Sequence, residues 1–470
     1  MTPTSSSSAL PRLLLLGLFG LPLVINPVIS ISFDDVYLAP KLWWIYGVIL
    51  PAALLLLWQG RAELVRGRKL LLVLGGFFGL LLLSTLVSGA GWRGWWGPDD
   101  RADGLLMHLV YGTLLLAGWV WGRSSSDAPA TFGSAVLIGG SLLALTNIAQ
   151  QLGVLGVPGD GGFSGVVATP YGGTLGHRGY LGGALALLLP VAVTAVRREQ
   201  VWTWGAVTLM GWAWTGSFSR GPWLAGAVGL IWLALWMRGR VPWRAWGAVV
   251  VGIALCAVTT QAQGGGRLFA WFGGDPASVS QGIADSSGRA ALWNSALLGI
   301  EERPLLGSGT LSLWQYMNAR PALEVLGEWG VREVAQVRRL NEAEADPPSF
   351  AVTHTDGKRE LVVLGINKVH NEYLDYALVY GLPAALLFTA LLVWGIGAAR
   401  GWAPGLSAGL VAYAAYLLTW PEVVRFAPIA WFMLGMTFAS GVHQALRTTA
   451  RPGANSGTRH AAELEVTSSP

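Results

Sequence analysis

Apolar stretches of about 20 residues recur along the whole chain, and polar connections separate them. A helix rises about 1.5 Å per residue, so a stretch of this length crosses the roughly 30 Å hydrocarbon core of a bilayer. In lipid, a helix satisfies all of its own backbone polar groups. The pattern therefore predicts an all-α polytopic membrane protein with about twelve spans. They are expected at 10–31, 38–58, 69–88, 104–122, 130–152, 179–196, 201–217, 221–237, 244–261, 371–399, 404–420 and 426–446.

Composition supports this class. Only 12% of the residues are charged and 53% are hydrophobic, whereas soluble proteins carry about 25% charged residues. The net charge of +5 comes from residues in short loops and forms no basic stripe, so we expect no nucleic-acid partner. The single cysteine, Cys256, excludes an intrachain disulfide.

Basic residues mark one side of the expected bundle. They occupy alternate connections and the segment after the last span: Arg61, Arg66, Arg68, Lys69, Arg123, Arg197, Arg198, Arg238, Arg240, Arg244, Arg400, Arg447 and Arg451. The other connections carry mainly acidic residues: Asp34, Asp35, Asp99, Asp100, Asp103 and Glu422. Loops rich in Lys and Arg stay in the cytoplasm. An even number of spans then puts both termini there.

One outer connection is far longer than the usual few residues. The expected organisation is helices 1–9 in residues 1–261, a large periplasmic loop or cap in 262–370, helices 10–12 in 371–446 and a disordered cytoplasmic tail in 447–470. A connection of this size is usually functional or disordered.

Parts of the long connection have patterns of their own. A helix is expected from Arg289 to about Glu302, where Trp293, Leu297 and Ile300 share an apolar stripe. An amphipathic helix of this kind lies along the membrane interface. The charged segment 324–344 is expected to be helical. A hairpin turn is expected at 355–358 between two β-prone runs.

Three expected spans begin on the outer side, near residues 179, 221 and 371. Helix N-termini favour anions, phosphate above all. Beside them stand His177, Arg178, Arg220, His370 and Asn371, and the loop helix adds Arg289. Arginine suits bidentate phosphate contacts, although at a membrane interface it is most often an anchor.

A neutral histidine is a suitable general base for a hydroxyl, because its reference pKa of about 6.5 lies near working pH. We expect His370 to serve an acceptor hydroxyl while Arg220 and Arg289 hold a phosphate leaving group, with no metal and no other cofactor. The alternative is an acidic site, in which the outer aspartates bind a divalent cation.

Three passages resemble the O-antigen ligase and O-antigen polymerase superfamily of bacterial membrane proteins. They are 217–224 (Ser-Phe-Ser-Arg-Gly-Pro-Trp-Leu), 288–309 (from Gly-Arg-Ala-Ala-Leu-Trp to Arg-Pro-Leu-Leu-Gly-Ser-Gly) and 370–374 (His-Asn-Glu-Tyr-Leu) with Gly381. Each passage alone is weak, but their order, the twelve spans and the long outer loop all match the family.

The resemblance implies a metal-independent, GT-C-like glycosyltransferase in the bacterial inner membrane. Its donor is a glycan on undecaprenyl diphosphate, taken on the extracytoplasmic face, and its acceptor is a glycolipid such as lipid A-core or another hydroxyl. By the resemblance, Arg220 and Arg289 grip the diphosphate and His370 helps to activate the acceptor.

The chain departs from the family at 173–181, where the usual Pro-Asn pair is missing. Arg178 is expected to assist the diphosphate grip, and His177, Asn371 and Tyr373 to support the site. A polymerase and a protein O-oligosaccharyltransferase remain open as alternatives. So do a membrane transporter, although the spans show no clear repeat and few charges, and a purely structural scaffold.

Overall fold

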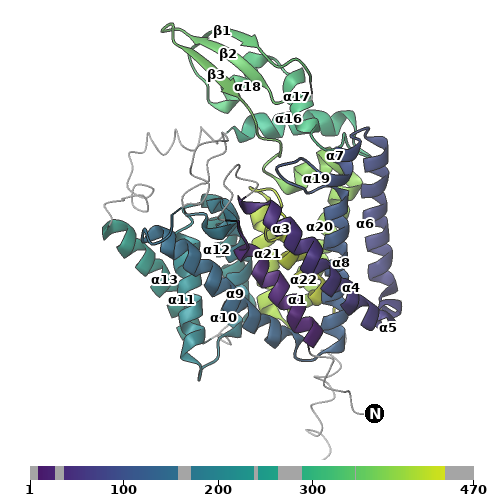
Figure 1. Cartoon of the computed structure of the whole chain (residues 1–470), viewed down its shortest axis with the longest axis vertical. Helices are drawn as coiled ribbons and strands as arrows, with labels where there is room; N and C mark the ends of the chain where they lie inside the picture. The colour runs from purple at the N-terminus through teal and green to yellow at the C-terminus, as the bar shows by residue number, and fades with distance from the viewer. Residues whose placement is uncertain are drawn as a thin grey trace, which may run out of the picture.

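The computed structural model describes residues 9–26, 36–156, 171–237, 242–262, 288–344 and 346–439. It is a helical bundle with a small cap at one end (Figure 1). Asp34, Asp35, Arg238, Arg240, Arg447, Arg451 and the tail 447–470 lie outside the described residues.

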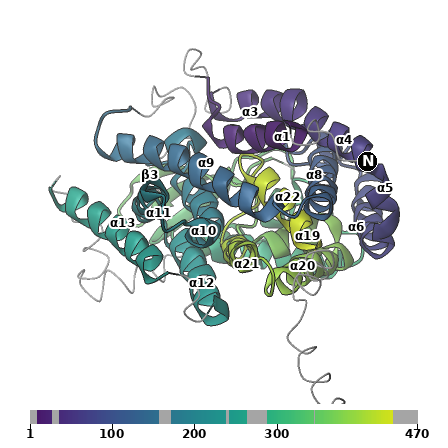
Figure 2. The same cartoon turned by 90° about the horizontal axis from the view of Figure 1, so that it is seen from below.

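The first part of the bundle runs to residue 262. Its elements are α1 (Ala9–Gly20), η2 (Leu21–Leu23), α3 (Ala39–Trp44), the π-helical η3 (Ile45–Ile49), α4 (Leu50–Gln59), α5 (Arg61–Leu64), η4 (Val65–Gly67), α6 (Arg68–Val87), α7 (Trp92–Trp96), α8 (Leu105–Ser124), α9 (Ala128–Gln151), η5 (Gly173–Leu175), α10 (Arg178–Ala195), α11 (Val201–Thr215), α12 (Arg220–Met237) and α13 (Trp243–Ala262). After the cap come α19 (Glu372–Tyr380), α20 (Leu382–Ala399), α21 (Pro404–Leu417) and α22 (Ala427–Thr437). Viewed from below, α10 lies inside the bundle among α9, α11, α12 and α21 (Figure 2).

A helix occupies most of each expected span. In the described part of the chain, seven stretches are long and apolar enough to cross a membrane: 39–59, 61–87, 105–124, 128–151, 178–195, 243–262 and 382–399. Three shorter apolar helices lie at 9–23, 404–417 and 427–437. The chain is therefore a mostly helical, polytopic membrane protein, and the number of twelve spans stays a prediction.

The expected continuous span 371–399 is wrong, because the chain bends at Gly381 between α19 and α20. Gly381 has φ +90°, and an added Cβ there would lie 2.2 Å from the Leu305 oxygen. The turn after α16 fills the break: Ser308 N donates to Leu378 O (2.7 Å) and Leu382 N to Pro304 O (2.8 Å). Apolar residues continue through the break, so hydrophobicity alone hides it.

The cap consists of α16 (Arg289–Glu302), α17 (Ser312–Ala319), α18 (Ala322–Trp329) and an antiparallel sheet in the order β1 (Val334–Arg339), β2 (Ser349–His354), β3 (Arg359–Val363). Helix α16 lies across the end of the bundle (Figure 1), with the bounds predicted from the sequence.

The predicted hairpin turn at 355–358 is confirmed: His354 N donates to Lys358 O (2.8 Å), and Gly357 has φ +82°. The helix expected over 324–344 is wrong beyond Trp329. A left-handed Gly330 ends α18, and β1 pairs with β2 instead. The partner strand outweighs the helical propensity of the charged residues.

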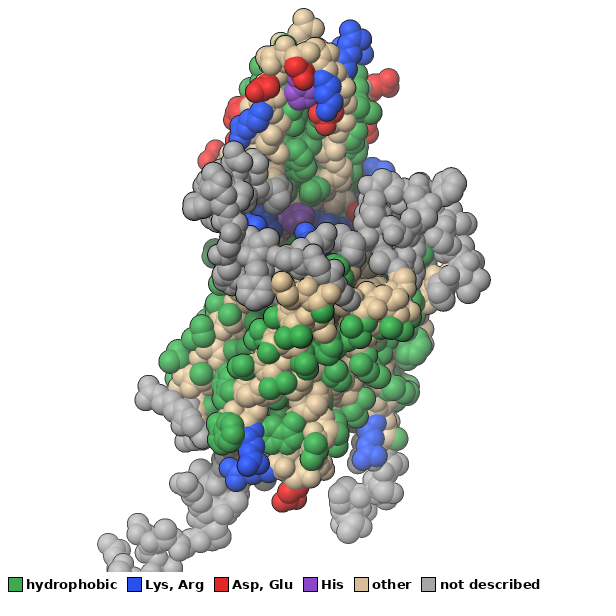
Figure 3. All heavy atoms as spheres, turned by 90° about the vertical axis from the view of Figure 1, so that its left-hand side faces the viewer, with side chains coloured by type: hydrophobic (Ala, Val, Ile, Leu, Met, Phe, Trp, Pro, Cys, Tyr) green, Lys and Arg blue, Asp and Glu red, His purple; other side chains and the backbone are tan. Residues whose placement is uncertain are grey.

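The described basic connections gather at the end of the bundle opposite the cap. Arg123 at the end of α8 pairs with Glu63 of α5 (2.9 Å), and α5 lies far from the sheet (Figure 1). Arg400 lies 5.1 Å over the Trp236 ring, so the ends of α12 and α20 meet. Figure 3 shows a broad band of hydrophobic side chains (green) along the bundle. On one side of the band lie basic side chains at the end opposite the cap, and on the other side a His lies with Lys and Arg side chains below the cap.

Candidate active site

Trp420, in the turn after α21, brings the starts of three helices together. Its ring lies 5.1 Å from that of His177, before α10, and 5.2 Å from that of His370, before α19. An added Cβ at Gly179 would lie 2.5 Å from Trp420 Cζ2, and one at Gly221 would lie 3.0 Å from its Nε1. The N-termini of α10, α12 and α19 therefore meet around one indole.

The backbone at His370 is unusual. Its φ is +56°, a left-handed conformation uncommon outside glycine, and such residues cluster at functional sites. The neighbours hold it there. The Asn371 side chain caps α19 by accepting from Tyr373 N (3.1 Å) and Leu374 N (3.2 Å), and Val369 N donates to Asp375 (3.2 Å).

Both histidines are neutral at physiological pH. Burial, then the charges of Arg101 and Arg289 and the neighbouring His177, lowers the pKa of His370 from 6.5 to about 3. Burial, then the charges of Arg425, Arg178 and Arg101, lowers the pKa of His177 to about 3. A neutral imidazole can accept a proton. An anion beside the arginines would raise both pKa values again.

The predicted arginines occupy two kinds of position. Arg289 starts α16, and its Nε is buried without a hydrogen bond to any described residue. Burial lowers the pKa of Arg289. The positive charge of Arg289 in turn helps to lower the pKa of His370. Arg178 and Arg220 are exposed and start α10 and α12, next to the glycines that pack on Trp420.

The three expected supporting residues fix the helices. His177 caps α10, accepting through Nδ1 from Gly179 N (3.1 Å). Asn371 caps α19, as described above. The Tyr373 hydroxyl donates to Ala414 O (2.9 Å), which fastens α19 to α21. These contacts give each of them a positioning role.

Sequence reasoning missed Arg101 and Trp420. Arg101 lies in the acidic connection before α8 and donates through Nη1 to the Tyr180 hydroxyl on α10 (3.0 Å). The one available signal was a lone arginine among aspartates, on a side otherwise short of basic residues. Nothing in the sequence singled out Trp420, because tryptophans near span ends usually form interfacial belts.

Lys368 was also missed. It is buried and pairs with Asp103 (3.0 Å) and Asp375 (2.9 Å). These carboxylates raise the pKa of Lys368 well above its usual value, although its burial alone would lower it. Asn367 donates to Asp100 (2.8 Å). The acidic connection is therefore tied to the segment that carries His370.

The alternative is a divalent-cation site on the outer acidic residues, and carboxylates of this region already have other partners. Asp103 binds Lys368 and Asp100 accepts from Asn367. Glu422 accepts from Tyr413 (2.5 Å) and from Trp431 Nε1 (2.8 Å), and burial raises its pKa to about 7. Among the residues that the structure describes, no group of three or more His, Cys, Asp or Glu could hold a metal ion.

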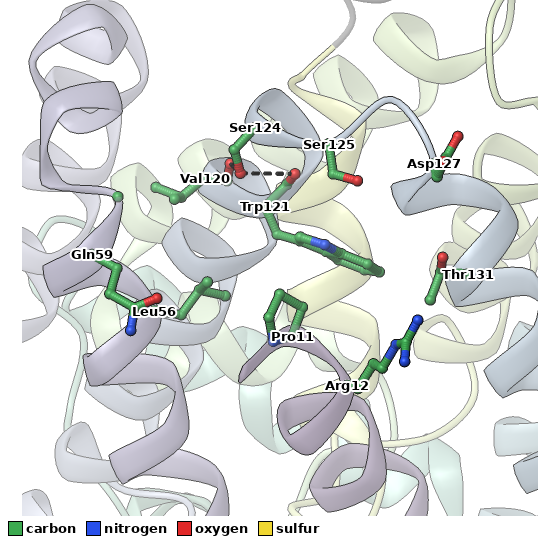
Figure 4. Close-up of a pocket in the computed structure, with 11 residues that line it drawn as sticks. Pro11, Arg12, Leu56, Gln59, Val120, Trp121, Ser124, Ser125, Asp127 and Thr131 are labelled. Atoms are coloured by element: carbon green, nitrogen blue, oxygen red, sulfur yellow. Dashed lines mark hydrogen bonds between the residues drawn. The ribbon is translucent and has the colours of Figure 1, made fainter. Parts of the chain in front are cut away.

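A cavity of about 380 Å³ lies far from Trp420, at the end of the bundle opposite the cap. Its lining comes from α1, α4, α8 and α9, with Arg12 and Asp127 on one side and Gln59 on the other (Figure 4). Beside the candidate site, a narrow gap between described residues is lined in part by Arg101, Tyr180, Glu422 and Arg425. The cavity lined by Arg12 and Asp127 therefore lies apart from the group of arginines and histidines.

Comparison with known proteins agrees with the resemblance seen in the sequence. The family model described as O-Antigen ligase matches residues 205–389. No curated protein matches the chain. The matched region contains Arg220, Arg289 and His370. The part of the chain that carries most of the candidate site is therefore assigned to the O-antigen ligase superfamily.

Proposed function

We propose that this membrane glycosyltransferase moves a glycan from undecaprenyl diphosphate to an acceptor hydroxyl, such as one on lipid A-core. The observation that carries the proposal is the meeting of three helix N-termini and two histidines at Trp420. The positive charge of Arg289 also lowers the pKa of the His370 imidazole. An N-terminus with arginines beside it attracts phosphate, and a neutral histidine within reach accepts a proton.

In the reaction, the acceptor oxygen bonds to the anomeric carbon of the glycan. The bond from that carbon to the diphosphate oxygen breaks, and undecaprenyl diphosphate leaves with the electron pair. His370 takes the proton of the acceptor hydroxyl and later releases it to water. Arg220 and Arg289, assisted by Arg178, hold the negative charge that grows on the diphosphate. His177, Asn371 and Tyr373 keep the helix starts in place.

Donor binding also adjusts the base. Without a ligand, the pKa of His370 is about 3, which is low for a general base. A diphosphate beside the arginines offsets their charge, so the pKa of His370 rises toward its usual value. The base therefore strengthens only when the donor is present, which limits unproductive proton transfer.

We further propose twelve spans, cytoplasmic termini and an extracytoplasmic site in the inner membrane. Support comes from the separation of charges: the described basic connections lie at the end opposite the cap, as the Arg123–Glu63 pair on α5 and α8 illustrates. Trp420 and His370 lie at the cap end, because α16 and its following turn pack on α19.

The test is transfer by the full-length protein in proteoliposomes, with lipid-linked donor and candidate acceptors, and mass spectrometry of the products. His370→Ala should abolish transfer while the protein still inserts and keeps its thermal stability. His354→Ala is the matched control, because His354 lies on the cap sheet and bonds to Glu360 (3.1 Å). Near-normal turnover by His370→Ala would refute the role of this residue.

The same assay separates the alternatives. A product built from two lipid-linked repeats identifies a polymerase, and a glycosylated protein identifies an oligosaccharyltransferase.

A further inference from the structure

Arg101 lies against the candidate site through a chain of direct contacts. Its Nη1 donates to the hydroxyl of Tyr180 (3.0 Å). The Tyr180 ring lies 4.7 Å from the ring of His177 and 6.0 Å from that of Trp420, and Trp420 is the ring neighbour of His370. The connection that carries Arg101 is fixed to the His370 segment by the Lys368–Asp103 pair (3.0 Å).

This guanidinium has few partners for a buried charge. The Arg101 side chain is 14% exposed. Its Nε has no hydrogen-bond partner among the described residues, and the Asp100 carboxylate stands 3.6 Å from it, beyond good hydrogen-bond geometry. Burying a charge is costly unless it is paired and hydrogen-bonded.

Arg320 shows how the same fold satisfies an arginine that only supports structure. Its side chain is 8% exposed. It donates to Ala291 O, Ser295 Oγ, Glu324 Oε1 and both carboxylate oxygens of Glu328. Arg101 has no such set. Asp103 binds Lys368. Asp100 accepts from Asn367 through Oδ1 and reaches Arg101 only through an ion pair of 3.6 Å from its Oδ2 to Nε, too long for a hydrogen bond.

We propose that Arg101 is a further diphosphate-binding residue, which grips the lipid diphosphate of the donor from the side of α8 and α10. This inference rests on the proposed function and adds to it a residue from outside the region matched to the family. A diphosphate oxygen would supply the acceptor that Nε lacks, and a charge-assisted, planar contact is the strongest that arginine makes. The Tyr180 hydroxyl holds the guanidinium in the required orientation.

The test is binding of farnesyl diphosphate and of farnesyl monophosphate to the full-length protein in detergent, by isothermal titration calorimetry. Loss of a hydrogen bond between charged groups weakens binding by about 10- to 100-fold. We expect that loss for farnesyl diphosphate with Arg101→Gln and a smaller loss with the monophosphate. Tyr180→Phe, which keeps the charge but removes its anchor, should weaken diphosphate binding less. Arg93→Gln, an exposed arginine on nearby α7, is the control and should bind as the wild type does.

The outcomes separate this inference from the proposed function. If Arg289→Gln loses diphosphate binding while Arg101→Gln and Tyr180→Phe bind as the wild type does, Arg101 has no such role and the proposed function stands. If the wild type itself binds neither lipid phosphate, the proposed function fails. If Arg101→Gln does not fold, Tyr180→Phe decides, and unchanged diphosphate affinity in that variant overturns the inference.

Discussion

At the residue scale, the site depends on how charge and burial act on His370. Its imidazole lies beside Trp420 in a left-handed backbone conformation, and burial and two guanidinium charges hold it neutral. The sequence predicted that His370 and Arg289 act together, because both stand in recognisable motifs. It could not predict Arg101 or Trp420, because their importance comes from contacts across the bundle.

Loss of a nearby guanidinium should be visible in the titration of His370. The groups that influence it are Arg101, Arg289 and His177, and the two arginines oppose its protonation. In Arg289→Gln, the pKa of His370 should therefore rise from about 3. The acidic limb of the kcat/KM profile should move to higher pH, because that profile reports the free enzyme. NMR of labelled histidine gives the direct reading, and an unchanged or lower pKa would contradict the arrangement.

A substitution of Lys368 tests whether its ion pairs hold the candidate site together. Lys368→Met leaves the carboxylates of Asp103 and Asp375 buried without their cation. Breaking a buried pair on one side costs about 3–5 kcal/mol. We expect a clearly lower thermal midpoint and loss of transfer. Lys358→Met, in the exposed hairpin turn of the cap, should leave both unchanged. Equal thermal midpoints for the two variants would show that the ion pairs of Lys368 with Asp103 and Asp375 contribute little to stability.

At the element scale, the bend between α19 and α20 is the part of the fold that hydrophobicity concealed. A run of apolar residues from Tyr373 to about Ala398 indicated one helix, but the turn after α16 hydrogen-bonds into the break at Gly381. The end of α16 at Glu302 was predictable because Pro304 follows its C-cap residue, Arg303. Strand β1 was not, since it depends on a partner strand ten residues or more away in the sequence.

Gly381→Ala tests this bend. The new methyl group would meet Leu305 O at 2.2 Å, at a φ of +90°, and a strained backbone of this kind costs about 1–3 kcal/mol. The variant should unfold at lower temperature and transfer glycan poorly, because α19 would no longer hold His370 in place. Gly397→Ala is the matched control within α20, where the added carbon meets nothing within 4 Å. A Gly381→Ala protein as stable and active as Gly397→Ala would rule out a required bend.

At the scale of the whole molecule, the proposed topology puts the cap and the basic connections on opposite sides of the membrane. Composition and charge distribution predicted this arrangement, and the described fold has the two at opposite ends of the bundle. Which end faces the cytoplasm is testable by labelling in a Cys256→Ser background, since Cys256 is the one native thiol. An impermeant maleimide added to spheroplasts should label His354→Cys on the cap and spare Glu199→Cys between α10 and α11. The reverse pattern would invert the proposed topology.

The most direct measurement is an electron cryo-microscopy structure of the full chain in a lipid nanodisc with a non-transferable donor analogue carrying an intact lipid diphosphate. We expect diphosphate density at the starts of α10, α12 and α19, within contact of Arg289 and Arg101 and beside His370. Saturated protein with the diphosphate bound anywhere else, such as the cavity lined by Arg12 at the opposite end, would contradict it.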